Sequence, residues 1–161
     1  MDWLSLLLKL SHVSLAMAIV AGMLGSRLLN RRARLSGDID VAWRLTRAAE
    51  PFDQLAERSG PLLILSGFLT AWTQGLPFAG LVTGWILLSI ALLVLLLVLI
   101  LTVFRPAGAR VEAALRQARQ EGRITPELRA AWQGGIGQRV ASVYGDLAAP
   151  AIIVLMILKP F

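Results

Sequence analysis

No charged side chain occurs between Arg58 and Arg105. A straight helix over residues 59–104 would reach roughly twice across a hydrocarbon core about 30 Å thick. The only break in this apolar stretch is the turn-like segment Gln74-Gly75-Leu76-Pro77, where we expect the chain to fold back on itself. The stretch therefore predicts two membrane-spanning helices, and the chain is expected to be an integral membrane protein.

The composition agrees with a membrane class and excludes several others. With 161 residues, 57% of them hydrophobic, and a mean hydropathy of +0.69, the chain is too apolar for a soluble protein and too short for two domains. We expect one integral membrane domain, residues 1–161. Cysteine is absent, which excludes disulfides, cysteine-bound zinc and cysteine-bound iron–sulfur clusters.

The predicted fold is all-α, a four-helix transmembrane bundle. Apolar stretches place the four spans at residues 3–29, 52–74, 79–104 and 140–158. The chain starts with Met-Asp-Trp rather than with a basic region, so we expect the first span to be retained instead of being removed as a signal peptide.

Two polar segments connect the predicted spans. In the first, Ser36-Gly37-Asp38 predicts a turn and helix cap, followed by an amphipathic helix from Ile39 that Pro51 and Pro61 would kink or divide. In the second, Arg105-Pro106 is expected to end the third span.

The rest of the second segment predicts a helical hairpin between spans 3 and 4. Val111–Gln120 reads as a soluble helix in which Glu112 and Arg116 are spaced for an ion pair. Gly122 is a stop signal, and Thr125-Pro126-Glu127 is a start signal for the next helix.

The arginines predict how the bundle is oriented. Residues 27–58 contain seven arginines and residues 105–139 contain seven more, whereas the 74–78 turn contains no basic residue. Positive charge collects on the cytoplasmic side of a membrane protein. We therefore expect cytoplasmic segments at residues 30–51 and 105–139 and both termini outside, which also explains the formal charge of +6 without a nucleic-acid partner.

The few ionisable side chains inside the spans are the candidate functional residues, because each costs about 2.5–3.5 kcal/mol at the centre of a membrane helix. One helical stripe of the first span carries several of them and is expected to face the bundle interior. Its members are Ser5, Lys9, His12, Ala16, Ile19, Met23 and Arg27.

His12 is the only histidine, and two interpretations remain open for it. A neutral imidazole in an apolar bundle is a common haem or metal ligand, with Met17, Met23 or Met156 as the second axial ligand. The alternative is a hydrogen bond to a serine or backbone carbonyl of a neighbouring span. Lys9 has two interpretations as well, since its ammonium can reach the outer interface or bind the carboxylate of a ligand.

Two further features concern contacts between helices. Asp146 and Arg27 are expected at similar depth near the cytoplasmic side, where they would form an ion pair. The Gly80-xxx-Gly84 pattern permits close approach of helices, either within the bundle or in a homodimer.

Several short motifs resemble those of small bacterial four-span membrane proteins. The first span contains Lys9-Leu-Ser-His12 and Ala21-Gly22-Met23-Leu24 followed by Arg27, and the chain ends in Lys159-Pro160-Phe161. One group with this pattern is a family of predicted integral membrane proteins of unknown function, which also often carries a stretch like residues 124–129. This resemblance implies a bacterial inner-membrane location.

The same motifs are distantly similar to the HemJ family, protoporphyrinogen oxidases that bind haem b. His12 matches that family's haem-ligand position, and Arg27 matches an arginine after the Ala-Gly motif. The HemJ family also has a lysine shortly after a tryptophan in span 3, whereas Trp85 is followed by Ile86-Leu-Leu-Ser-Ile90. The chain therefore resembles the uncharacterised group more closely.

Three functions follow from this pattern. The first is a bundle, not an enzyme, that holds haem b, another porphyrin or a different hydrophobic ligand beside His12, with Lys9, Met23 and Arg27 as further binding residues. The second is a HemJ-like oxidoreductase that passes hydrogens from porphyrinogen to quinone. The third is a cofactor-free interaction or transport subunit.

Overall fold

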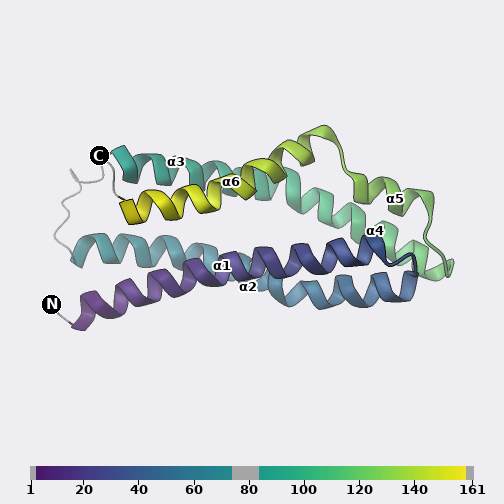
Figure 1. Ribbon diagram of the computed structural model, residues 1–161, viewed down its shortest axis with the longest axis horizontal. Coiled ribbons are helices and arrows are strands. Elements are labelled where there is room, and N and C mark those ends of the chain that lie inside the picture. The colour runs from purple at the N-terminus through teal and green to yellow at the C-terminus, as the bar shows by residue number, and fades with distance from the viewer. Residues whose placement is uncertain (1–2, 74–83, 159–161) are drawn as a thin grey trace. The chain divides into compact units, whose positions relative to one another are not determined.

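The computed structural model describes residues 3–73 and 84–158, and every regular element in these ranges is a helix (Figure 1). The chain separates into two compact units, Met1–Ala79 and Gly80–Phe161. Each unit is described by itself below.

The first unit is a pair of long helices, α1 (Trp3–Leu35) and α2 (Ile39–Thr73), which run side by side in opposite directions (Figure 1). The predicted turn between them is confirmed. Gly37 has a φ of 67°, a conformation that glycine adopts at little cost. Asp38 caps α2, because its Oδ1 accepts hydrogen bonds from the backbone nitrogens of Asp40 at 2.7 Å and Val41 at 3.2 Å.

Both helices are longer and less interrupted than the sequence suggests. α1 continues past the predicted end of the first span to Leu35, since arginine is a good helix former and basic residues in the last turn oppose the helix dipole. α2 is undivided at Pro51 and Pro61. Each proline removes one backbone hydrogen bond, and packing along α1 maintains the helix on both sides of it.

Glycine allows α1 and α2 to approach each other closely. A Cβ atom added to Gly22 would lie 2.6 Å from the carbonyl oxygen of Phe52 and 3.0 Å from Cβ of Ala56. Further along the same contact, a Cβ added to Gly67 of α2 would lie 3.1 Å from Cε1 of His12. Backbone contact of this kind is how membrane helices associate without a hydrophobic driving force.

The second unit starts with one continuous helical rod that contains α3 (Gly84–Leu99), a π-helical segment η2 (Ile100–Phe104) and α4 (Arg105–Gln120). The expectation that Arg105-Pro106 ends the helix is wrong. Pro106 lies in the first turn of α4, where its missing N–H removes little. The π segment joins the two α-helices, with the N–H of Arg105 bonded to the carbonyl of Ile100.

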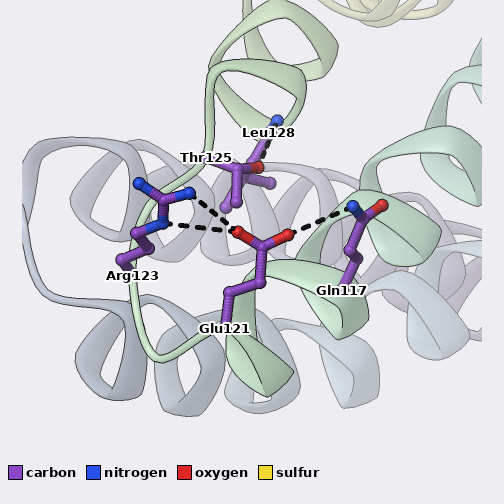
Figure 2. A network of polar contacts seen from close by, with 5 residues as sticks. All are labelled: Gln117, Glu121, Arg123, Thr125 and Leu128. Atoms are coloured by element: carbon purple, nitrogen blue, oxygen red, sulfur yellow. Dashed lines mark hydrogen bonds and ion pairs between the residues drawn. The ribbon is translucent and has the colours of Figure 1, made fainter.

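α4 and α5 (Pro126–Gln133) form the expected pair of short helices, joined by a turn at Gly122 with a φ of 67°. The hydroxyl of Thr125 accepts a hydrogen bond from the backbone N–H of Leu128 at 3.2 Å, so it caps α5 as predicted. Beside the turn, Glu121 accepts hydrogen bonds from Gln117 and Arg123, each at 3.2 Å (Figure 2). The buried side chains between the helices are Leu115, Ala118, Leu128 and Trp132.

The last helix, α6 (Ile136–Leu158), starts four residues earlier than the predicted fourth span. Gly134, with a φ of 61°, ends α5, and α6 follows directly. α6 runs antiparallel to α3 (Figure 1), and the Tyr144 hydroxyl donates a hydrogen bond of 2.8 Å to the carbonyl oxygen of Leu92.

Three helices in the described ranges are long and apolar enough to cross a membrane, namely Trp3–Leu35, Gly84–Gln120 and Ile136–Leu158. Three of the four predicted spans lie on these helices. The predicted span at 52–74 lies mainly on α2, which is not among them. The predicted 74–78 turn and the start of span 3 fall outside the described residues.

Candidate functional site

His12 lies at the α1–α2 contact, with part of its side chain accessible. Its Nδ1 is 3.1 Å from the hydroxyl oxygen of Ser66, a buried residue of α2. The Ser66 hydroxyl donates its own hydrogen to the carbonyl oxygen of Leu63 at 3.0 Å. This contact corresponds to the second interpretation of His12, a hydrogen bond to a serine of a neighbouring helix.

The hydrogen bonds of Ser66 determine which imidazole nitrogen carries hydrogen. Because the Ser66 hydrogen is directed to Leu63, the serine oxygen can only accept from His12. The imidazole also hydrogen-bonds to the backbone of Leu63, which again requires a ring N–H on the side of α2. We therefore assign the hydrogen to Nδ1, and Nε2 keeps its lone pair. No hydrogen bond of Nε2 is found among residues 3–73 and 84–158.

Lys9 lies one turn before His12 on α1 and is half-buried. An interval of three residues places two side chains on the same helix face, about 4.5 Å apart along the axis. An ammonium and an unprotonated imidazole nitrogen are therefore neighbours on this face. We call Lys9, His12 and Ser66 the outer cluster.

Met23 and Arg27 lie far from the outer cluster. α1 is continuous, so a rise of about 1.5 Å per residue separates Met23 from His12 by roughly 16 Å and Arg27 from His12 by roughly 22 Å. Met23 of the same chain therefore cannot be the second axial ligand of a metal bound to His12. Arg27 is exposed, and the helix position next to it, Ser26, is buried instead.

Ser26 is the centre of a second polar group, which we call the inner cluster, with Asn30 and Asp53. The Asn30 side-chain nitrogen donates to Ser26 Oγ at 3.1 Å, and the Ser26 hydroxyl donates to the Asp53 carboxylate. On the same helix as Asp53, Arg47 forms an ion pair with Glu50 and lies over the Trp43 ring, 4.5 Å from its centre. The predicted Arg27–Asp146 ion pair involves one residue of each unit and stays a prediction.

The sequence analysis missed the partners that α2 supplies. Ser66 and Ser26 each hold a polar side chain of the other helix or turn, yet neither was predicted to bind anything. A signal was present, because Ala42, Ala49 and Ala56 recur every seven residues, and Ser59 and Ser66 have the same spacing. Small residues at this interval mark the face of a helix that packs against another.

The comparison with known families covers nearly the whole chain. Residues 6–160 match the family described as predicted integral membrane protein (DUF2269). The chain belongs to the DUF2269 family. Membership confirms the expected membrane family of unknown function, and no similarity to the HemJ family is found. No curated protein and no solved structure matches the chain.

Proposed function

We propose that this DUF2269 protein spans the bacterial inner membrane four times, with both termini outside, and binds a hydrophobic ligand at the outer cluster. The ligand that suits the cluster best is a metalloporphyrin such as haem b, coordinated by Nε2 of His12. The proposal does not include catalysis.

The observation that carries the proposal is the hydrogen bond between His12 and Ser66. A histidine that binds a metal through one nitrogen nearly always donates the hydrogen of the other to a nearby oxygen, which fixes both the tautomer and the ring orientation. Ser66 provides this oxygen, because its own hydrogen is directed to Leu63. Nε2 is then available as a ligand without a change of tautomer.

Lys9 and the surface around His12 add the rest of the binding chemistry. Haem is a planar apolar group with two carboxylates, and an ammonium one turn from the coordinating histidine suits such a carboxylate. Exposed apolar side chains of α1 flank His12, among them Leu10 and Val13. Since Met23 is too distant, we expect a five-coordinate metal, or a sixth ligand from a second copy of the chain.

A second function is supported by the same contact. A buried hydrogen bond between membrane helices contributes about 0.6 kcal/mol on average and can serve packing alone. The protein would then be a cofactor-free interaction or transport subunit, and His12 would hold α1 against α2.

The absorption spectrum of the full-length protein, purified after expression with haem supplied, separates these functions. We expect a Soret band that is absent in His12→Ala. We also expect Ser66→Ala to keep the band but to bind haem 10–100-fold more weakly, the usual effect of removing the partner of a metal-bound histidine.

Ser89→Ala is the matched control for Ser66→Ala. The Ser89 hydroxyl is buried like that of Ser66, but it bonds to the Trp85 carbonyl within its own helix. Its removal should leave haem affinity unchanged. A colourless wild-type preparation, or a Soret band that persists in His12→Ala, would contradict the ligand proposal, and the colourless result would favour the cofactor-free subunit.

A further inference from the structure

The depth of Asp146 in the membrane follows from the contact between α3 and α6. The hydrogen bond from Tyr144 to the Leu92 carbonyl places these two residues at the same level. The helices are antiparallel (Figure 1), so Asp146, two residues further along α6, lies near the level of Ile90. Residues 84–104 of the α3 rod contain no charged residue and extend about 31 Å, which matches the hydrocarbon core.

Within this core Asp146 lies well away from either end. Arg105, the first charged residue after the apolar stretch, is 15 residues beyond Ile90, or about 22 Å along the helix axis. The nearest charged residue before Asp146 on its own helix is Arg139, seven residues or about 10 Å away. This depth differs from the expectation that Asp146 lies at the cytoplasmic entry of the last span.

The surroundings of Asp146 within its unit contain few charges. α3 and η2, the elements that pack against α6, carry no ionisable side chain over residues 84–104. On α6 the other titratable or charged groups are Arg139 and Tyr144, and the Tyr144 hydroxyl is already bonded to α3. In hydrocarbon a carboxyl group is more stable neutral than ionised, by roughly a hundredfold on membrane-insertion scales.

Pro150 adds a second polar group at the same position. Proline has no N–H, so the carbonyl of Asp146, four residues earlier, loses its helical donor. Interrupted helices of this kind in membranes are tolerated where the backbone faces protein or water rather than lipid. The side chain of Asp146 is exposed within the described structure, so a water molecule can reach it without displacing a packed neighbour.

We propose that Asp146 is a proton-binding site inside the membrane, where its carboxyl takes up and releases a proton at the depth of Ile90. The site lies in the second unit and does not depend on a ligand at the outer cluster. In this role Asp146 would couple the protein to the proton gradient, as membrane-embedded carboxyls of pumps and transporters do.

The proposal can be tested on the full-length protein in lipid nanodiscs with dicyclohexylcarbodiimide. This reagent partitions into hydrocarbon and reacts with protonated carboxyl groups, and mass spectrometry of peptides identifies the modified residue. We expect modification at Asp146 at a rate that falls as the pH is raised. Glu127, an exposed carboxyl at the start of α5, should react at least roughly tenfold more slowly, because it is ionised and lies outside the core.

A water-soluble carbodiimide provides the matched control and should reverse this order, with Glu127 reacting before Asp146. The measurement is made on the wild-type protein, so it does not require that Asp146→Asn folds. Two results would overturn the proposal. One is an Asp146 that stays unmodified by the hydrophobic reagent at every pH, as expected of a permanently ionised partner in an ion pair. The other is an Asp146 that reacts with the water-soluble reagent as fast as Glu127.

Discussion

The two units of this protein are stabilised in different ways. In the first, α1 and α2 approach so closely that Gly22 contacts the backbone of Phe52, and side chains such as His12 and Ser66 bond from one helix to the other. In the second, the hairpin of α4 and α5 buries Leu115 and Leu128 almost completely, as a water-soluble domain does.

This difference reflects the solvent on each part of the chain. Lipid is as apolar as leucine, so helices in the membrane gain little from burying leucine and associate instead through small residues and hydrogen bonds. In water, the burial of a leucine side chain contributes about 1.5–3 kcal/mol. Substitutions in the two units should therefore differ in kind as well as in size.

The largest effect is expected in the α4–α5 hairpin. Leu128 has no exposed surface, so Leu128→Ala should destabilise the hairpin by about 2–5 kcal/mol, the usual cost of such a cavity. Hydrogen exchange of the α5 amides should rise accordingly. Leu35→Ala, at an exposed position at the end of α1, is the control and should change exchange little. An unchanged α5 in Leu128→Ala would mean that the hairpin is not held by leucine burial.

An intermediate effect is expected where α1 and α2 meet. A Cβ at Gly22 would overlap the Phe52 carbonyl oxygen, so Gly22→Ala should destabilise the helix pair by about 1–3 kcal/mol. The same substitution at Gly60 of α2, where nothing lies within 4 Å of the added atom, should stabilise by up to about 1 kcal/mol through helix propensity. Thermal unfolding in detergent measures both. Equal effects of the two substitutions would show that the close approach at Gly22 is not needed.

The smallest effect is expected from the single hydrogen bond between α3 and α6. Tyr144→Phe removes the hydroxyl that bonds to Leu92, at a cost of about 0.5–1 kcal/mol, since hydrogen bonds between membrane helices are weak. Thermal unfolding against wild type detects the change, with Tyr144→Leu as a variant that also loses the ring. A loss of several kcal/mol in Tyr144→Phe would show that the second unit also depends on hydrogen bonds between its membrane helices.

Much of the fold could be predicted from local chemistry. The caps at Asp38 and Thr125 and the turns at Gly37 and Gly122 all follow from residues within one turn of the position concerned. Pro51, Pro61 and Pro106 could not be interpreted in this way. Whether a proline interrupts a helix depends on the packing and hydrogen bonding around it, which the sequence does not state.

The candidate site was predictable only on α1. His12 and Lys9 stood out because an ionisable residue in an apolar segment is rare. Ser66 did not, because serine is common in membrane helices and its role depends on the register between α1 and α2. The depth of Asp146 was missed for the same reason, since it depends on the pairing of Tyr144 with Leu92.

The central claim of this account is that α2 crosses the membrane, so that the two arginine-rich segments lie on the same side. With four spans both segments face the cytoplasm, whereas with three they lie on opposite sides. The chain has no cysteine, so Arg32→Cys and Gln120→Cys each introduce a single thiol for an impermeant maleimide. We predict that neither thiol reacts in intact cells and that both react after the membrane is permeabilised. Reaction of one thiol but not the other in intact cells would contradict the four-span arrangement.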